Sequence, residues 1–485
     1  MKKFDYDLIV LGGGAAGFVS AKMAQGLGKK VALIEKNRLG GDCTWFGCIP
    51  SKTLIKVSTI AHQINNTGKF GLLQNTDISP DTDHVMEHVR SVVKRVYDGH
   101  TPETFTKIGI DIFFGEAQFI DNHRIALGDK ILSAIKYMIS TGSSPFIPDI
   151  QGLDAVPYHT NRTIFDIEKL PASMIVLGGG PIGTELAMAF HRLGVRVHIL
   201  ETADRILIRE DRELADMLSL NIQGEGITLL TKIKPLRYFC KNGRIVLAYQ
   251  DEKNRPGTID ADTVLIAIGR KPNVQGLNLE KAGVEYSAQG IKTNKRLQTT
   301  ASNIYSCGDV VGPYRFSHMA EYQAVIATRN ALFPFQKKVD YRHVAWCTFT
   351  DPELAHAGLT EQEAREKLGD RIRVYRHEYK NTDRGRTDGI ETGISKFICD
   401  SRGTLIGAHI LGKHAGDLIH EAQLTKSLGI PFYKIYSAVH IYPTLSDIVR
   451  QPAKLCYIDR LQSNIFLRIL RNIMGKRRYF LGRFY

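Results

Sequence analysis

The sequence predicts an α/β protein in which one β-α-β unit with a glycine-rich turn occurs twice. Each copy begins with an apolar run typical of a buried strand, passes through several glycines into a helix-like segment, and returns to a second strand that ends on glutamate. The composition agrees with this fold class. A chain of 485 residues, 43% hydrophobic and 24% charged, suits a globular protein of roughly three or four domains.

The first unit occupies the N-terminal region. Its predicted strands are residues 7–11 and 31–34, and the glycines of its turn are Gly12, Gly14 and Gly17. Glycines at this spacing permit a tight turn, a close approach of the backbone to a pyrophosphate, and close packing of the helix on the strand. Glu35 ends the second strand, where a carboxylate can bind a ribose hydroxyl. We therefore predict a dinucleotide site at this turn.

The second unit repeats this arrangement in the middle of the chain. Its strands are residues 174–177 and 195–200, and its glycines are Gly178, Gly180 and Gly183. Glu201 follows the second strand and favours NADH, because a nicotinamide dinucleotide with a 2′-phosphate would usually call for arginine there. Arg205, one helical turn further on, leaves NADPH possible. Two Rossmann-like domains imply two dinucleotides that pass electrons in series.

Cys43 and Cys48 form the most informative chemical pattern of the chain. Pro50 and the apolar positions after it have helical spacing, so Cys48 lies at the start of a predicted helix. A helix N-terminus stabilises a thiolate and lowers the pKa of the thiol. The alternatives are a structural disulfide, two buried free thiols, or half of a zinc site, but no second close pair of cysteines or histidines follows nearby. We predict a redox-active pair and no metal site.

The five other cysteines have no spacing that suggests pairing, and we expect them to be reduced thiols in packed or surface positions. They are Cys240, Cys307, Cys347, Cys399 and Cys456. The net charge of +14 favours anionic partners such as dinucleotides, nucleic acid or a membrane surface, and composition does not choose among them.

Much of the excess positive charge lies in residues 460–485, which contain no acidic residue. Apolar residues at helical spacing separate the basic ones, so this tail could lie on an anionic membrane surface or pack on its own domain or on a second subunit. No apolar run reaches the ~18 residues of a membrane span. Asp5 and Asp7 interrupt the only stretch that could pass for a signal peptide. We predict a cytoplasmic protein, with peripheral membrane contact possible through the tail and no nucleic-acid partner.

Three further segments complete the pattern: Ser140-Thr141-Gly142, Ala267-Ile268-Gly269 and Gly308-Asp309. With the two glycine turns and the cysteine pair, the chain resembles the class I pyridine nucleotide-disulfide oxidoreductases over residues 1 to about 455. This is the family of dihydrolipoamide dehydrogenase, glutathione reductase and mercuric reductase. The resemblance implies two Rossmann-like domains, one for FAD and one for NAD(P)H, and a C-terminal α+β dimerisation domain. It also implies a homodimer in which each C-terminal domain completes the active site of the partner.

The resemblance also assigns roles to single residues. It makes Cys48 the thiolate nearer the flavin, Cys43 the thiol that meets the acceptor, and Lys52 with Glu185 an ion pair beside flavin N5. Glu35 corresponds to the acid that holds the adenosine ribose of FAD. The other cofactor-binding residues that it implies are Gly12, Gly14, Gly17, Lys52, Thr141, Gly142, Gly308 and Asp309 for FAD, and Gly178, Gly180, Gly183, Glu201 and Gly269 for the nicotinamide dinucleotide.

The expected domain order follows from these assignments. The first part of the FAD-binding domain, with the cysteine pair, is expected at 1–150, the NAD(P)-binding domain at 151–270, and a central domain completing the FAD site at 271–340. The dimerisation domain is expected at 341–458 and the basic amphipathic tail at 459–485.

The segment 440–447, His-Ile-Tyr-Pro-Thr-Leu-Ser-Asp, departs from the dihydrolipoamide dehydrogenase pattern. In that pattern a histidine before Pro-Thr, with glutamate five residues later, moves the thiol protons. Here Tyr442 takes the place of the histidine and Asp447 that of the glutamate. A phenol, with an ordinary pKa near ~10, stays protonated at neutral pH, whereas histidine, near ~6.5, can accept a proton. His440 is either a substitute base or, as we expect, a structural residue. The Tyr442–Pro443 bond is expected to be cis, as in the family.

Tyrosine before Pro-Thr resembles mercuric reductase. However, Cys456 stands alone near the C-terminus, where a mercuric reductase has a vicinal cysteine pair, which leaves the reduction of Hg(II) open. We predict an FAD-dependent NAD(P)H:disulfide oxidoreductase of the mercuric-reductase-like branch, with a small-molecule or disulfide acceptor that the sequence does not name. The alternatives are a dihydrolipoamide dehydrogenase and, from another class, a membrane- or nucleic-acid-associated protein that acts through its basic tail.

Overall fold

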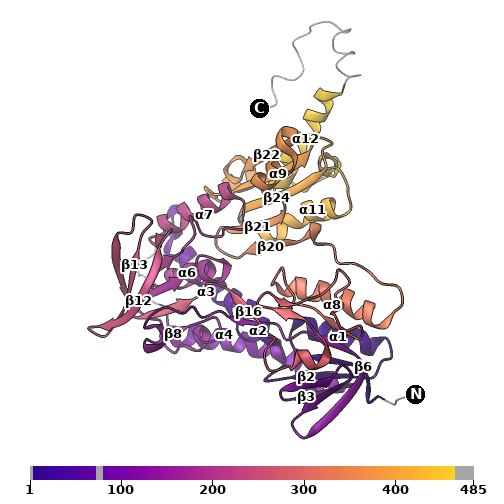
Figure 1. The fold of residues 1–485 in the computed structure, drawn as a ribbon. Coiled ribbons are helices and arrows are strands. Elements are labelled where there is room, and N and C mark those ends of the chain that lie inside the picture. Colours follow the sequence, from indigo (N-terminus) through magenta and orange to yellow (C-terminus); the bar gives the residue numbers. More distant parts are fainter. Residues whose placement is uncertain (1–3, 73–79, 465–485) are drawn as a thin grey trace. The chain divides into compact units, whose positions relative to one another are not determined.

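The computed structural model describes residues 4–72 and 80–464, and its chain forms two compact units (Figure 1). The first unit comprises Met1–Leu207 and Ile222–Tyr341. The second comprises Ile208–Asn221 together with the described part of Arg342–Tyr485. The predicted tail falls almost entirely outside the described residues. Within the described ranges, no helix is both long enough and apolar enough to cross a membrane.

The first sheet of the first unit contains the N-terminal β-α-β repeat. Its parallel strands are β1 (Tyr6–Leu11), β2 (Val31–Glu35), β3 (Ile110–Phe114), β6 (Lys130–Ile139) and β19 (Ile304–Ser306), in the order β3-β2-β1-β6-β19. Antiparallel strands β4 (Ala117–Asp121) and β5 (Arg124–Leu127) extend from β6. Leu8 and Val10 enter one core cluster, whereas Ile9 and Leu11 enter the other. Both faces of β1 are therefore covered, as a parallel sheet requires.

Helices α1 (Ala15–Gly26) and α8 (Ser317–Leu332) pack against each other beside this sheet. Because α1 directly follows β1, and α8 comes soon after β19, both helices begin near the carboxyl edge of the sheet. Ligands of open α/β sheets bind at this edge. Strand β19 lies within 271–340 and pairs with β6, so this part of the chain returns to the first sheet.

The second sheet of the first unit contains the second repeat. Its parallel strands, in the order β11-β10-β9-β15-β8, are β8 (Tyr158–His159), β9 (Ser173–Leu177), β10 (Arg196–Leu200), β11 (Thr228–Leu230) and β15 (Thr263–Ile266). Helix α6 (Pro181–Arg192) follows β9. An antiparallel sheet of β12 (Lys234–Lys241), β13 (Arg244–Gln250) and β14 (Pro256–Ala261) lies between β11 and β15 in the chain.

Between β2 and β3, the described residues form the α-helices α2 (Gly41–Trp45), α3 (Cys48–Asn65), α4 (Thr82–Tyr97) and α5 (Pro102–Thr106). Helix α3 packs against both α4 and α6, so the helix that begins at Cys48 contacts the first helix of the second repeat. Short strands β7 (Ser143–Pro145) and β16 (Arg270–Pro272) pair with each other, and β17 (Tyr286–Ser287) pairs with β18 (Gly290–Ile291).

The second unit is built on an antiparallel sheet in the order β20-β21-β24-β23-β22. The strands are β20 (Ala345–Thr348), β21 (Glu353–Gly358), β22 (Ile372–Glu378), β23 (Ile394–Asp400) and β24 (Leu405–Gly412). The helices are α9 (Glu361–Leu368), α10 (Asp383–Thr387), α11 (Ala415–Ser427) and α12 (Asp447–Ser463). Helices α11 and α12 share one core with the sheet, whose buried residues include Phe397, Phe432 and Ile448.

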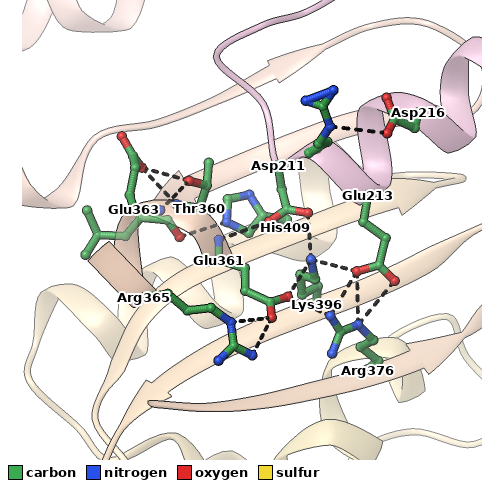
Figure 2. A network of polar contacts seen from close by, with 12 residues as sticks. Asp211, Glu213, Asp216, Thr360, Glu361, Glu363, Arg365, Arg376, Lys396 and His409 are labelled. Carbon is green, nitrogen blue, oxygen red and sulfur yellow. Dashed lines mark hydrogen bonds and ion pairs between the residues drawn. The ribbon is translucent and has the colours of Figure 1, made fainter. Parts of the chain in front are cut away.

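The segment Ile208–Asn221, which contains most of helix α7 (Arg212–Gly224), belongs to the second unit although it lies within the predicted 151–270 domain. Charge explains this. The Lys396 ammonium is buried and contacts Asp211 at 2.7 Å, Glu213 at 2.6 Å and Glu361 at 2.8 Å (Figure 2). Burial, followed by the neighbouring His356, lowers the pKa of His409 beside this cluster to about 3. Removing the acids would leave a buried, unpaired charge.

Candidate redox site

The two glycine turns adopt matching backbone conformations. Gly12 has a φ of +105° and Gly178 a φ of +110°, in the left-handed region that favours glycine. A Cβ on Gly17 would overlap the carbonyl oxygen of Gly12, and one on Gly183 would overlap that of Gly178. Helices α1 and α6 therefore approach their own strands closely only because these positions lack side chains.

The middle glycine of each turn faces open space. A Cβ on Gly180 would meet nothing within 4 Å, and one on Gly14 would meet only the Cα of Gly41, at 3.8 Å. Both glycines are helix N-caps without a side-chain cap, so the first N–H groups of α1 and α6 keep their capacity to bind an anion. The two turns thus fit a dinucleotide pyrophosphate.

The acids at the ends of β2 and β10 are also placed alike. Glu35 accepts a hydrogen bond from the N–H of Gly13 at 2.7 Å through Oε2, and Glu201 accepts one from the N–H of Gly179 at 2.7 Å through the same atom. Each carboxylate is therefore held against its own glycine turn, beside the position where an adenosine ribose would extend from the pyrophosphate.

Cys43 and Cys48 lie on successive helices, and both are partly buried free thiols. A hydrogen bond from Cys43 lowers the pKa of Cys48 to about 6, with further contributions from Ser317 and from the charge of Lys52, and against the effect of burial. The same hydrogen bond and burial raise the pKa of Cys43. Cys48 is the first residue of α3, where the helix dipole also favours a thiolate. The two thiols thus have distinct states near neutral pH, a thiolate at Cys48 and a protonated Cys43.

Ser317 is a residue of this site that the sequence analysis missed. Its Oγ lies 3.4 Å from the Sγ of Cys48, and Ser317 is the first residue of α8. The N-termini of α3 and α8 therefore both lie at the Cys48 sulfur atom. The only available signal was that Ser317 follows the Gly308-Asp309 segment closely in the chain, which does not by itself indicate contact with a cysteine.

Lys52 and Glu185 form an ion pair. The Lys52 Nζ lies 2.7 Å from the Glu185 Oε2, and the Glu185 side chain is only 7% exposed. Lys52 follows Cys48 by about one turn of α3, and Glu185 lies on α6, so the contact joins the cysteine helix to the second repeat. The structure therefore brings together the two residues that the resemblance paired.

Arg270 connects three segments at this site, namely α2, β7 and the loop after Gly308, and the sequence did not indicate it. Its guanidinium contacts the Asp42 carboxylate, donates to the Ser143 Oγ at 2.7 Å, and lies 3.8 Å from Asp309. Ser143 in turn donates to Asp309 at 2.7 Å. Since Asp42 precedes Cys43 on α2, Arg270 joins the helix that carries Cys43 to the Gly308-Asp309 loop. It directly follows the Gly269 landmark, which was the available signal.

Thr141, Gly142 and Gly308 lie where β6 and β19 end. Thr141 donates through Oγ1 to the Asn273 carbonyl at 2.7 Å. Gly142 has a φ of +71° and Gly308 a φ of +82°, so both turns need glycine. Because β1, β6 and β19 are parallel neighbours, these segments and the first glycine turn share one edge of the sheet, as a common FAD site requires. Gly269, with a φ of +140°, follows β15 in the second sheet.

Tyr442, in the second unit, is 69% exposed and donates to the Oδ2 of Asp383 at 2.8 Å. This hydrogen bond raises the pKa of the phenol, and the nearby charges of Asp383 and Asp447 add to the effect. The Tyr442–Pro443 bond is cis, which confirms the prediction. Asp447, expected in the place of the glutamate partner, begins α12 and contacts Arg450 at 3.5 Å. The phenol is therefore paired with an acid that the sequence did not indicate.

Both ring nitrogens of His440 are occupied. Nε2 lies 2.8 Å from the Glu421 Oε1 on α11, and Nδ1 lies 2.9 Å from the Ala438 carbonyl oxygen. The side chain is only 10% exposed. Both ring nitrogens therefore face hydrogen-bond acceptors of the second unit. The structural role expected for His440 stays a prediction.

Comparisons with known proteins agree with this geometry. A family model described as pyridine nucleotide-disulphide oxidoreductase matches residues 6–327, and the model of the dimerisation domain of that family matches residues 344–453. A mercuric reductase of Staphylococcus aureus is 33% identical over 445 residues, which are 91% of this chain and 81% of that protein. A dihydrolipoyl dehydrogenase of Bacillus subtilis (strain 168) is 30% identical in an alignment of 472 positions that covers 93% of this chain and 97% of that protein.

A solved structure with a similar fold is the HOCl-induced flavoprotein disulfide reductase RclA from Escherichia coli. It is 27% identical to this chain, with a TM-score of 0.83, and the match covers 93% of this chain and 100% of RclA. A Cu(II) complex of the same reductase also has a TM-score of 0.83, covering 94% of this chain.

Proposed function

Because the chain belongs to the pyridine nucleotide-disulphide oxidoreductase family, we propose that it reduces a thiophilic acceptor with electrons that arrive at Cys43 and Cys48. The family establishes the coarser function: an FAD-dependent, NAD(P)H-using flavoprotein disulfide oxidoreductase with a dimerisation domain. The resemblance, the fold class and the two cofactors predicted from the sequence are thereby confirmed. The acceptor, the branch of the family and the role of each residue belong to the proposal.

The cofactors are held by the two repeats. The first glycine turn would bind the pyrophosphate of FAD, with Glu35 at the adenosine ribose and Asp309 at the ribityl chain, and the second turn would bind the nicotinamide dinucleotide. When bound, FAD supplies the conversion of a hydride into thiol chemistry. Glu201 supports NADH as the donor. The Arg205 guanidinium lies 3.4 Å from Asp204, a contact that competes with any contact to a 2′-phosphate.

The cysteine pair stores the two electrons. Reduction of the Cys43–Cys48 disulfide by two electrons and one proton yields one thiolate and one thiol, which matches the lowered pKa of Cys48 and the raised pKa of Cys43. Lys52 stabilises negative charge at Cys48, and its contact with Glu185 keeps the ammonium paired in both redox states. Cys43, as the interchange thiol, would meet the acceptor.

The hydrogen bond from Tyr442 to Asp383 is the observation that carries the choice of branch. A phenol with a raised pKa cannot take a proton from a dithiol substrate at neutral pH, which disfavours dihydrolipoamide oxidation. A soft metal ion held by thiolates needs no such base. The relatives support both candidates, since mercuric reductases and dihydrolipoyl dehydrogenases are similarly identical to this chain. The Cu(II) complex of RclA supports a metal ion as acceptor.

An acceptor comparison tests the proposal. The purified protein, reconstituted with FAD, would be supplied with NADH and separately with Hg(II), Cu(II), glutathione disulfide or lipoamide, and NADH oxidation would be followed at 340 nm. We expect a metal-dependent rate that Cys43→Ser removes. Two Cu(II) ions, or one Hg(II) ion, should be reduced for each NADH consumed. A fast rate with lipoamide and none with either metal would contradict the proposal.

A second candidate is dihydrolipoyl dehydrogenase, and the contact between His440 and Glu421 is the observation in its favour. A histidine paired with a carboxylate is a common proton acceptor once one of its nitrogens is released. If this candidate is correct, dihydrolipoamide should reduce NAD⁺ rapidly, and His440→Gln should remove that rate while Tyr442→Phe leaves it intact. Metal-dependent NADH oxidation should be unaffected by His440→Gln under the favoured proposal.

The loop that carries Tyr442 supports assembly with a second subunit. Val439 and Ile441 are 101% and 81% exposed in the single chain, an unusual state for neighbouring apolar side chains. The dimerisation domain matches this region, and we propose that the Tyr442 loop of each subunit completes the active site of the other. Contact of residues 460–485 with an anionic membrane remains a proposal from charge alone, which liposome sedimentation with and without that segment would test.

A further inference from the structure

Cys399 and Cys456 lie side by side in the core of the second unit, although their spacing in the sequence does not suggest pairing. Cys399 is on β23 and Cys456 is on α12, two elements that pack against each other, and the two thiols are close enough for one to act on the pKa of the other. Their exposed fractions are 0% and 3%. Both belong to the core cluster that joins this sheet to α12. A Cβ placed on Gly403, in the turn that follows β23, would lie 3.8 Å from the Cys456 Sγ.

The surroundings give the two thiols different acidities. The hydrogen bond from Cys399 lowers the pKa of Cys456, and one from Tyr375 adds to this effect, whereas burial and the charge of Asp459 oppose it. Burial raises the pKa of Cys399. The single proton of the Tyr375 hydroxyl is shared between Cys456 and the Asp459 carboxylate, whose oxygen lies 3.1 Å away. Cys456 is thus the better nucleophile of the two, and Cys399 is the thiol that keeps its proton.

We propose that Cys399 and Cys456 are a second redox-active pair, which a peroxide converts into a disulfide that joins β23 to α12. The Cys456 thiolate, formed by loss of its proton, attacks one oxygen of hydrogen peroxide and becomes a sulfenic acid. The hydroxide that is released takes up the proton that Cys456 had lost and leaves as water. The Cys399 thiol then attacks the sulfenic sulfur, the S–S bond forms, and a second water leaves. Two thiols and one peroxide give one disulfide and two waters.

The bond would close a loop that contains the whole Tyr442 segment. Helix α12 begins at Asp447, directly after that segment, and its contacts with β22, β23 and the region 432–437 hold it on the sheet. A covalent link at Cys456 would fix this helix and constrain the unfolded chain, so that oxidation stabilises the second unit. This inference does not depend on the acceptor of the first cysteine pair.

Peptide mapping tests it directly. The full-length protein with FAD bound would be reduced, freed of reductant, treated with hydrogen peroxide, blocked with an alkylating reagent and digested with trypsin without reduction. Trypsin should release Cys399 in residues 397–402 and Cys456 in residues 455–460, because Lys396, Arg402, Lys454 and Arg460 flank them. We expect a linked species lighter by two hydrogen atoms than the sum of the two reduced peptides. Residues 39–52 hold both Cys43 and Cys48 and report oxidation of the first pair in the same digest.

Two controls define the outcomes. In Cys456→Ala the linked species should be absent, and the peptide with Cys399 should be recovered alkylated. Oxidation should raise the apparent Tm of the wild type by about 5 °C or more, and should not raise that of Cys456→Ala. If Cys43 and Cys48 become fully oxidised while Cys399 and Cys456 are both recovered alkylated, the proposal is wrong. The wild-type digest gives this answer even if the variant fails to fold.

Discussion

The two cysteine pairs of this chain have the same internal asymmetry and different surroundings. In each pair, a hydrogen bond from one thiol lowers the pKa of its partner: Cys43 acts on Cys48, and Cys399 acts on Cys456. The pKa of Cys43 is raised by the same hydrogen bond and by burial, and that of Cys399 chiefly by burial. Lys52 and Ser317 further stabilise the Cys48 thiolate, and the pair is partly exposed. Cys456 instead has the Asp459 carboxylate nearby and is buried.

This difference separates electron transfer from structural cross-linking. A partly exposed thiolate near a cation can be oxidised and reduced in every turnover. A buried thiol near a carboxylate should react slowly and, once oxidised, stay oxidised for longer. Pairing alone therefore does not make a catalytic disulfide; access and local charge decide it.

Removal of the thiolate in the first pair should have the largest effect. Cys48→Ser should abolish the long-wavelength thiolate-to-flavin absorbance on anaerobic reduction and lower turnover with any acceptor by about 10³-fold or more, because the electrons have no sulfur to enter. The spectrum and the rate are measured on the same sample. Cys456→Ser serves as the matched control and should retain the absorbance band; loss of the band there would remove the distinction between the pairs.

Arg270→Met should have the next largest effect, because helix α2, which carries Cys43, and the Gly308-Asp309 loop lose the side chain that both contact. We expect turnover to fall by about 10²-fold, the cost of a small misplacement at a reaction centre, together with weaker FAD retention after gel filtration. Arg162→Gln is a milder comparison, since Arg162 contacts the same Asp42 at 3.2 Å but does not reach Ser143. Equal losses of turnover in both variants would show that Arg270 contributes no more to turnover than Arg162 does.

Ser317→Ala should shift the acidity of Cys48 without removing it. Alkylation of Cys48 in the reduced protein should rise with pH through a midpoint of about 6, since the thiolate reacts and the thiol does not. Loss of the hydroxyl should move that midpoint upward by about one pH unit, so that the rate near pH 6 falls roughly fivefold. Ser317→Thr should restore the midpoint. A profile that does not move would exclude the hydroxyl from the stabilisation of the thiolate.

Tyr375→Phe should have the smallest effect and is confined to the second pair. It removes one hydrogen bond to Cys456, so the pKa of that thiol should rise and peroxide-driven linkage to Cys399 should slow by about threefold at neutral pH. The time course of the linked peptide measures this. Oxidation of Cys43 and Cys48, followed in the same digests, should keep its rate. Slowing of both pairs together would indicate a general loss of stability.

The sequence predicts the parts of the site that depend on local geometry. The two glycine turns and their acids lie within single β-α-β units, and Cys48 and Lys52 are about one turn apart on one helix, so spacing along the chain was sufficient. Glu185 came only from the family resemblance, because its contact with Lys52 joins two different repeats.

The remaining contacts depend on segments that are far apart in the chain. Ser317 reaches Cys48, Asp383 pairs with Tyr442, and Glu421 pairs with His440 through tertiary packing that has no sequence period. The same reason explains why Cys399 and Cys456 were treated as isolated. A strand and a helix bring them together, and no spacing rule connects positions in two such elements.

The acids near the start of α7 set a limit on how this protein can be divided. The C-terminal residues that match the dimerisation domain contain Lys396 but not Asp211 or Glu213, which neutralise it from an earlier part of the chain. A fragment cut at residue 342 would carry a buried ammonium with only Glu361 beside it. Grafting that fragment onto another reductase would succeed only if the recipient supplied acids at the same place. The C-terminal fragment can therefore be moved to another protein only together with the segment that contains Asp211 and Glu213.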